Sequence, residues 1–427
     1  MIVERLVGVI AFFNLVVGAI FFLCYLYQLI YVIIPFIKKP MPHKKEKIHN
    51  IAILICARNE ESVIGQLLDS VDAQNYPRDT LFVFVVADNC TDKTAQISRE
   101  RGAVVYERSN NERIGKGYAL NFLLKKVFSE HSHKNIDAFI LLDADNILDP
   151  GYVRAMNQTY CDGYNVTTSY RNSKNYGDNW LSAAYGIWFM REARFLNYSR
   201  FLLGTSCAVS GTGFLFSREL IEKFGGWKYF LLTEDIEFTV DCIVAGEKIG
   251  YCNDAVLYDE QPYTFSQSWR QRLRWSKGFL QVWSKYGNRL WRSIFRGSFG
   301  AFDMTMTVCP AYLISLMSII FDLVGFIICA AMGEAESGRL LLYLMIGSIL
   351  QAYGLFFLMA LLTLISEWKS IHCKPIKKIL YIFAFPIFLI SYMPIALAAI
   401  FARVEWKPIH HTRSVSVEDI VNDDKKE

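Results

Sequence analysis

The stretch AFILLDAD, residues 138–145, places an apolar run of strand length directly before two aspartates. Two earlier runs have the same form: NIAILICA (residues 50–57) ends in Arg58-Asn59-Glu60, and LFVFVVA (residues 81–87) ends in Asp88-Asn89. Near-continuous apolar runs are typical of parallel strands that are buried on both faces. Ligands of open parallel sheets bind beyond the carboxyl ends of the strands, so the three polar clusters predict one binding site.

The region around these runs has the pattern of an α/β domain. Between about residues 49 and 263, short β-rich runs alternate with amphipathic stretches, which is typical of a largely parallel sheet with crossover helices. Each polar cluster taken alone has a second interpretation as a turn or helix cap, because Asp and Asn favour both.

The composition excludes several classes of protein. Of 427 residues, 53% are apolar, above the roughly 45–50% of soluble domains, which argues against disorder and against an ordinary cytosolic enzyme. The net charge is only +4, whereas a nucleic-acid binder concentrates basic residues on one face, so we expect no nucleic-acid partner. The ten cysteines form no C-x-x-C pair, and we interpret them as isolated thiols.

The apolar excess lies at both ends of the chain. Residues 6–37 carry no charge, and this stretch is longer than the roughly 20 apolar residues that a membrane crossing needs. We therefore predict an N-terminal transmembrane helix within residues 1–37. Lysines follow it at positions 38, 39, 44, 45 and 47, which places the next region in the cytoplasm.

Three further apolar segments lie near the C-terminus, at about Met304–Met332, which Pro310 and Asp322 interrupt, at Leu340–Ser366 and at Ile379–Phe401. We therefore expect transmembrane helices in residues 304–402 and a polar tail in residues 403–427. Counting each apolar segment as one membrane crossing places this tail on the outer side of the membrane. Pro386 and Pro394 leave open a re-entrant last segment instead, which is tolerated where protein covers the freed backbone groups.

Two more motifs follow the strands in order. Thr233-Glu234-Asp235 comes after a Gly225-Gly226 turn, and Gln271-Arg272-Leu273-Arg274-Trp275 comes next. With the D-x-D of residues 143–145, these motifs make residues 51–275 resemble the membrane-bound family 2 glycosyltransferases, the group of cellulose, hyaluronan and poly-N-acetylglucosamine synthases. The resemblance implies a cytoplasmic GT-A-like (nucleotide-diphospho-sugar transferase) domain over residues 48–263, flanked by transmembrane helices.

The resemblance also implies a donor site. Asp143 and Asp145 would hold magnesium or manganese, metals that prefer carboxylates and substrate phosphates, with Asp145 as the direct ligand. The other expected donor contacts are Asp88 to the uracil or ribose, Arg58 and Glu60 around the uracil, Lys116 beside the donor and Arg274 at the diphosphate. Many polymerising members carry two adjacent acids where this chain has Asp88-Asn89. A flexible turn is the second interpretation of the Gly115-Lys116-Gly117 segment.

An acceptor site is implied beside it. Asp235 is the expected general base, which would take the proton of an acceptor hydroxyl while that oxygen attacks the anomeric carbon. The remaining expected acceptor contacts are Glu234, Gln271, Trp275, Gly211 and Thr212. A helix N-terminus with acids in its first turn is a second, compatible interpretation of residues 233–235.

Residues 264–300 are expected to form amphipathic interface helices that carry the Q-x-x-R-W motif. Between Trp269 and Arg296 the chain has eight basic residues and no acid, interleaved with tryptophans, as suits a membrane interface. Interface anchoring is the simpler explanation of Trp283 and Trp291. The segment Trp406–Arg413 resembles tails that fold back near the active site in relatives, which would make the tail cytoplasmic.

Together these features predict an inverting, multi-pass glycosyltransferase of the plasma membrane that binds the lipid bilayer. We expect transfer of a hexose or N-acetylhexosamine from UDP-glucose or UDP-N-acetylglucosamine to a growing β-linked polysaccharide, processively and coupled to export. Transfer to a lipid acceptor without processivity is the alternative. Whether a partner subunit in the cell envelope takes part in export stays open. A catalytically dead sugar-nucleotide sensor would have lost a motif acid, yet Asp143, Asp145 and Asp235 are all present.

Overall fold

The centre of the protein is one eight-stranded sheet. The structure, a computed structural model, describes residues 2–310, 312–405, 413 and 415–421. The strands are β1 (Ile51–Ala57), β2 (Leu81–Asp88), β3 (Val104–Arg108), β4 (Ala138–Asp143), β5 (Ile147–Leu148), β6 (Val166–Ser173), β7 (Phe214–Ser217) and β8 (Ile249–Asp259). They lie in the order β3-β2-β1-β4-β7-β6-β8-β5. The predicted parallel strands β1, β2 and β4 are confirmed, while β7 runs antiparallel between β4 and β6.

The period of two along a strand divides the core into two layers. On β1, Leu54 packs with one cluster and Ile53 with the other, on opposite faces of the sheet. The first face is covered by α5 (Lys116–Glu130), α7 (Trp180–Arg191), α9 (Arg218–Lys223) and α10 (Glu234–Val244), and the second by α3 (Ile64–Asp72), α4 (Thr94–Glu100) and α6 (Tyr152–Cys161). After α7 come a π-helix (Glu192–Asn197) and α8 (Tyr198–Leu203).

The strand register brings the polar clusters together. Ala57 at the end of β1 lies opposite Ala87 of β2, and Cys56 lies opposite Asp143 of β4. The residues that follow each strand therefore meet at one edge of the sheet, as the sequence predicts.

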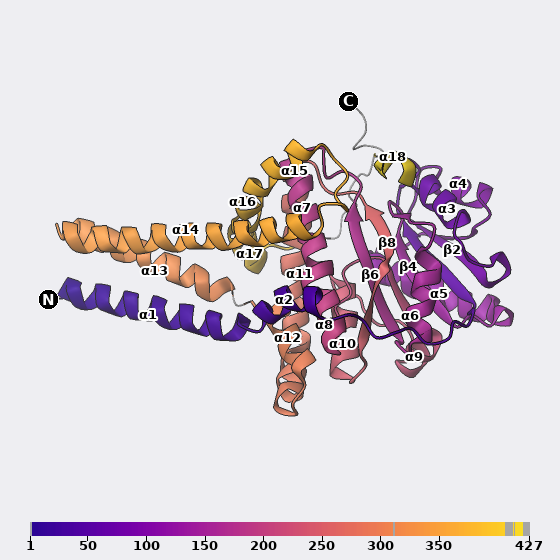
Figure 1. The fold of residues 1–427 in the computed structure, drawn as a ribbon, viewed down its shortest axis with the longest axis horizontal. Coiled ribbons are helices and arrows are strands. Elements are labelled where there is room, and N and C mark those ends of the chain that lie inside the picture. The colour runs from indigo at the N-terminus through magenta and orange to yellow at the C-terminus, as the bar shows by residue number, and fades with distance from the viewer. Residues whose placement is uncertain (1, 311, 406–412, 414, 422–427) are drawn as a thin grey trace.

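Apolar helices extend from this domain as an arm (Figure 1), made of α1 (Ile2–Tyr25), α13 (Tyr312–Ala331) and α14 (Ala335–Ser366). The short helix α2 (Gln28–Ile37) continues α1 toward the domain. Four helical segments of the described chain are long and apolar enough to cross a membrane: Val3–Ile37, Leu313–Ala331, Ala335–Ser366 and Pro375–Phe401.

The expected start of the second span is wrong. Met304 belongs to α12 (Phe299–Val308), a helix that ends before Pro310, and the apolar segment begins only at Leu313. Proline lacks the N–H that would continue the helical hydrogen bonds, which explains the break.

The last apolar segment is broken, as the prolines allow. It consists of α15 (Pro375–Tyr381), a 3₁₀ turn (Ile382–Ala384), α16 (Phe385–Ile390) and α17 (Tyr392–Phe401). Arg272 donates to Phe388 O at 2.9 Å and to Ser391 Oγ at 2.7 Å, so a protein side chain covers backbone at the junction of α16 and α17.

The described tail returns to the catalytic domain. The Arg413 backbone N–H donates to Glu260 at 3.1 Å, and Ile420 of α18 (Val417–Val421) packs on Ile147 and Tyr258. The crossing count that put the tail outside is therefore wrong by one, because tail and domain lie on the same side. Of the segment Trp406–Arg413, residues 406–412 lie outside the described residues.

A long helix lies where the arm meets the domain. The 31-residue α11 (Phe265–Phe295) runs across the direction of the arm (Figure 1). Thr264 caps its start, since its hydroxyl accepts from Gln267 N–H at 3.3 Å.

A buried ion pair joins the arm to the domain. Arg200 of α8 donates to both carboxylate oxygens of Asp303 in α12, at 2.7 and 3.0 Å. Tyr31 and Tyr27, from α2 and the turn before it, donate to the same carboxylate at 2.7 and 2.8 Å. With four charge-assisted bonds, this buried carboxylate fixes the first membrane segment against the catalytic domain.

Candidate active site

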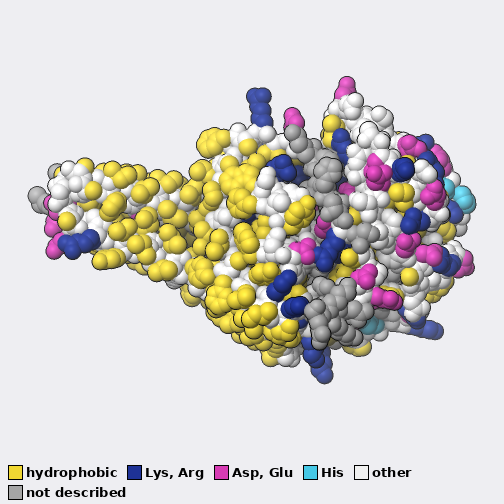
Figure 2. Space-filling model, turned by 90° about the horizontal axis from the view of Figure 1, so that it is seen from above, with side chains coloured by type: hydrophobic (Ala, Val, Ile, Leu, Met, Phe, Trp, Pro, Cys, Tyr) yellow, Lys and Arg dark blue, Asp and Glu magenta, His cyan; other side chains and the backbone are white. Residues whose placement is uncertain are grey.

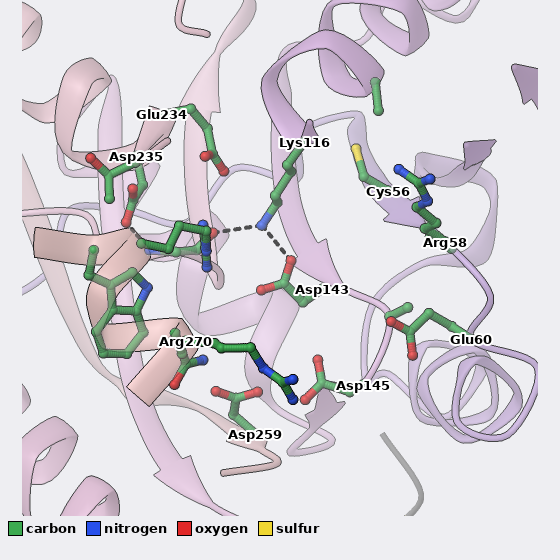
Figure 3. A pocket seen from close by; sticks show the side chains of 18 of the residues that line it. Cys56, Arg58, Glu60, Lys116, Asp143, Asp145, Glu234, Asp235, Asp259 and Arg270 are labelled. Carbon is green, nitrogen blue, oxygen red and sulfur yellow. Dashed lines mark hydrogen bonds and ion pairs between the residues drawn. The ribbon is translucent and has the colours of Figure 1, made fainter. Parts of the chain in front are cut away.

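A cavity of about 570 Å³ lies at the carboxyl edge of the parallel strands. It gathers residues from every motif that the sequence singles out (Figure 3). Its lining includes Arg58, Glu60, Asp88, Lys116, Asp143, Asp145, Gly211, Glu234, Asp235, Gln271, Arg274 and Trp275. Twelve of the thirteen predicted site residues thus share one cavity.

Thr212 is the exception among these predicted residues. Its side chain is buried, donates to Asn146 Oδ1 at 2.5 Å and accepts from Asp143 N–H at 2.8 Å. Gly211 and Gly213 both have positive φ, which turns this side chain inward behind the D-x-D backbone. Thr212 therefore supports the cavity wall, and we no longer expect it to touch the acceptor.

The base of the cavity near β2 is held by an ion pair. Asp88 is buried and pairs with Arg108 at the end of β3. Asn89 follows in the left-handed region at φ 54°, and its side chain accepts the Asn110 N–H at 2.8 Å. The carboxylate thus has a fixed place beside Arg58 and Glu60 on the wall.

Lys116 links the D-x-D motif to the acceptor side. Its ammonium pairs with Asp143 and donates to Gly211 O at 2.8 Å. Burial alone would lower its pKa, but the neighbouring Asp143 and Glu234 outweigh this effect and raise it. The lysine is therefore a fixed cation that faces the cavity between these two carboxylates (Figure 3).

The glycine after this lysine is required by packing. A Cβ at Gly117 would lie 2.1 Å from Tyr229 O, so only glycine allows this close approach of α5 to the segment before α10.

The D-x-D pair offers oxygen ligands to a divalent cation. Asp145 is buried at 3% exposure, and one of its oxygens accepts Glu260 N–H at 3.0 Å. Asp143 lies on the same wall of the cavity. The described residues hold no cluster of three or more metal-ligating side chains. Two carboxylates completed by substrate phosphates are a usual set for Mg²⁺, so these residues fit such an ion.

Two charged residues beside this pair were missed. Arg171 of β6 donates through Nε to Asp259 of β8 at 2.7 Å, and its guanidinium lies 3.8 Å from the centre of the Phe189 ring. Burial raises the pKa of Asp259 to about 7; Arg171 opposes this shift and Asp145 adds to it. Asp259 ends β8, Arg171 lies two residues before the end of β6, and no motif marks either residue in the sequence.

Glu234 and Asp235 form a second acidic pair, of which Glu234 is buried and Asp235 is partly buried. Asp235 accepts the Gly211 N–H at 2.6 Å. Burial raises the pKa of Glu234 to about 7, with a further rise from Asp235, and burial also raises the pKa of Asp235. Thr233 makes no side-chain cap, although α10 does begin at Glu234. A carboxylate with a raised pKa can accept a proton near neutral pH.

The start of α11 closes the cavity on the side of Glu234 and Asp235. Arg274 donates to Leu232 O at 2.9 Å, and the Trp275 ring packs edge-on against Tyr185 and Phe189. The Oε1 atom of Gln271 is buried without a hydrogen-bond partner among the described residues. A buried unpaired acceptor in a cavity wall suits a sugar hydroxyl as its partner.

Further lining residues had no signal in the motifs. They are Arg270 and Gln267 of α11 and Arg403, Val404 and Glu405, which follow the last apolar segment. The last three place the cavity directly beside the end of a membrane segment.

Comparisons with known proteins agree with this arrangement. The chain is 25% identical over 250 residues to the beta-monoglucosyldiacylglycerol synthase of Synechocystis sp., covering 57% of this chain and 50% of that protein. It is 25% identical over 242 residues to the poly-beta-1,6-N-acetyl-D-glucosamine synthase of Staphylococcus aureus, covering 56% of each. The matched part thus spans about half the length of these curated relatives.

A solved structure shares the fold. The mannosyltransferase PcManGT of Pyrobaculum calidifontis, in complex with GDP-Man and Mn²⁺, superposes with a TM-score of 0.57 at 17% identity, over 91% of this chain and 99% of that one. The GT-A-like fold expected from the sequence is confirmed. The family description "Glycosyltransferase like family 2" matches residues 49–278, more than half of the chain, and this segment contains every motif described above. The chain belongs to glycosyltransferase family 2.

Proposed function

We propose that this chain transfers a hexose or N-acetylhexosamine from a UDP-sugar, with inversion, to an acceptor presented at the membrane interface. One observation carries the proposal: a single cavity contains residues of the three strand-end clusters and of the two later motifs, and it is bounded by Arg403–Glu405, directly after the last membrane segment. The active site therefore opens where a membrane-bound acceptor can reach it.

The donor end suits a uridine diphosphate. We propose that Asp88, held by Arg108, binds the uracil or ribose, with Arg58 and Glu60 beside it. Lys116 and Arg274 would face the diphosphate, because both are cations on the cavity wall. UDP-glucose and UDP-N-acetylglucosamine are the proposed donors.

Asp145 and Asp143 would hold magnesium or manganese. When bound, such a cation supplies neutralisation of the charge that grows on the leaving diphosphate. Asp143 is already paired with Lys116, so one side chain of this pair can serve the metal and the other the phosphate.

Asp235 would act as the general base. It accepts the proton of the acceptor hydroxyl, whose oxygen forms a bond to the anomeric carbon. The bond from that carbon to the phosphate oxygen breaks at the same time, and UDP leaves with the bonding electrons. One direct displacement inverts the configuration, so an α-linked donor gives a β-linkage.

The membrane arm favours a lipid acceptor over an exported polymer. Most side chains in the seam between α1, α13 and α14 are apolar, including Val7, Ile10 and Leu341, and one polar contact crosses it, from Asn14 Nδ2 to Asp322 at 2.8 Å. A sugar chain needs hydrogen-bonding partners along its path and does not suit such a seam. We therefore place transfer to a lipid headgroup first, reversing the order expected from the motifs.

Extension of a β-linked polysaccharide, processive and coupled to export, is the second candidate. It is favoured by Trp275, whose ring lies on the acceptor wall where a sugar can stack. An envelope partner subunit would then supply the rest of the path.

The proposed location is the plasma membrane, with several crossings and a cytoplasmic catalytic domain. The lysines that follow the first membrane segment support this orientation.

The test is donor screening with product analysis. The purified full chain, in vesicles of bacterial lipid, is given radiolabelled UDP-sugars with or without Mg²⁺ or Mn²⁺. We expect UDP release that requires the metal and is lost in Asp145→Asn but kept in Asp254→Asn, an exposed control on β8. A single sugar on lipid supports the first candidate, and a long polymer supports the second. Failure to release UDP from any donor would contradict the proposal.

A further inference from the structure

We propose that the C-terminal end of α11 and the start of α12 form a binding surface for anionic phospholipid headgroups. We name this surface the α11–α12 tip, made of Trp291, Arg292, Phe295, Arg296 and Phe299. The inference rests on the proposed function only in that it takes the chain to be embedded in a bilayer.

The tip exposes large aromatic side chains. Phe295 is 84% exposed, Trp291 44% and Phe299 41%, and the Trp291 and Phe295 rings stack at 6.3 Å. Such exposure is unfavourable in water, whereas aromatic rings gather at the level of lipid headgroups. The apolar part of the tip thus suits a bilayer surface.

Within the described part of the chain, the basic side chains of the tip have no acidic partner. Earlier on the helix, Lys285 pairs with Glu237 and Arg289 pairs with Asp241, both in α10. Arg292 and Arg296 are exposed and form no ion pair within the described residues. Each guanidinium is therefore available to a phosphate oxygen, which its planar fork matches.

The tip lies where headgroups would be. The α11 helix runs across the direction of the arm, at the side of the domain where the arm joins it (Figure 1). Figure 2 shows hydrophobic side chains over the arm and over the adjoining part of the domain. Lys and Arg side chains lie at the border of this hydrophobic surface with the more polar surface beyond it. A bilayer around the arm would thus place its headgroups along α11.

The same helix carries the acceptor side of the active site. Trp275 and Trp291 lie about 24 Å apart along one continuous helix, at 1.5 Å per residue. Between them, Val282, Tyr286 and Leu290 pack into a core shared with α10 and α12. Lipid bound at the tip would therefore hold the acceptor wall in position above the membrane.

The experiment uses the full chain in nanodiscs of phosphatidylcholine alone or mixed with phosphatidylglycerol. The first readout is quenching of tryptophan fluorescence by brominated phosphatidylglycerol compared with brominated phosphatidylcholine. We expect stronger quenching by the anionic lipid in the wild type, and loss of this difference in Trp291→Phe and in the double variant Arg292→Gln/Arg296→Gln. Each arginine should account for about fivefold in apparent affinity for the anionic lipid.

The second readout is the rate of UDP release. Anionic lipid should raise it in the wild type and in Arg218→Gln, a control at a surface ion pair of α9, but not in the double variant. Equal quenching and equal lipid response in the wild type and the double variant would overturn the inference. Absence of UDP release in every lipid would instead contradict the proposed function, and the quenching comparison still decides the role of the tip.

Discussion

Gly278→Ala should uncouple the two sides of the active site. Gly278 lies one turn after Arg274 on α11, where the helix packs against the segment that carries the acidic pair. A Cβ added there would lie 2.5 Å from Thr233 Cγ2 and Oγ1 and 2.9 Å from Thr233 Cβ. Carbon atoms pack best at about 3.5–4.0 Å, so the two elements must separate by roughly 1 Å.

That displacement has a predictable cost. Thr233 directly precedes Glu234 and Asp235, while α11 carries the acceptor wall around Trp275. Moving the base by roughly 1 Å relative to its substrate lowers a rate by about 100-fold. We expect this loss in kcat with a much smaller loss of UDP affinity, because Asp88 and Lys116 lie on other elements and only Arg274 of the proposed donor contacts lies on α11.

A matched control is available on the same helix. A Cβ at Gly287 would meet only Trp283 atoms, at 3.4–3.5 Å, which is an ordinary contact. Both substitutions favour the helix by about 1 kcal/mol, so their difference isolates the contact with Thr233. The assay is metal-dependent UDP release with isothermal titration of UDP. Equal kcat in Gly278→Ala and Gly287→Ala would refute the reasoning.

Three other predictions follow from the active site and from the ion pair between Arg200 and Asp303. Trp275→Ala should reduce product formation more than donor hydrolysis, measured as labelled product against UDP release, and an equal loss of both would assign the ring a structural role. Activity should fall as the pH drops, because burial raises the pKa of Asp235 and this carboxyl must give up its proton to act as base; in a pH–rate profile Glu234→Gln should move this limb to lower pH, and an unmoved limb would contradict the coupling. Asp303→Asn should lower the free energy of unfolding by about 3–5 kcal/mol, since Arg200 would stay buried without its partner; thermal unfolding in detergent measures this, and an unchanged midpoint would be inconsistent with it.

The sequence predicts the first half of the fold well because its strands carry a strong signal. The runs of β1, β2 and β4 are apolar on both faces, and polar residues follow each run immediately. Because β1, β2 and β4 pair in parallel, Arg58, Asp88 and Asp143 meet at one edge of the sheet. The three strand-end clusters could thus be assigned to one site before any coordinates, and the family resemblance added residues 233–235 and 271–275.

The second half carries a weaker signal. Strand β6 contains Thr167, Thr168 and Ser169, so no apolar run marks it, and it pairs with β8 across a register shift. Arg171 and Asp259 therefore could not be placed from the pattern, although both line the cavity, Asp259 at the end of β8 and Arg171 near the end of β6. The direction of the Thr212 side chain could not be predicted either, because it depends on the positive φ of the two neighbouring glycines.

The return of the tail could not be predicted by counting apolar segments. A count treats each segment as a full crossing, whereas the last one is broken between α16 and α17 and covered at the break by Arg272. Long-range contacts such as that of Arg413 with Glu260 determine the side on which the tail lies.

The most direct test of the account is one substitution with two readouts. Asp235→Asn keeps the shape of the side chain but removes the base, so sugar transfer should fall by about 100- to 10,000-fold while UDP binding stays as in the wild type. Transfer at the wild-type rate, or loss of UDP binding together with transfer, would contradict the assignment of Asp235 as the base beside a separate donor site.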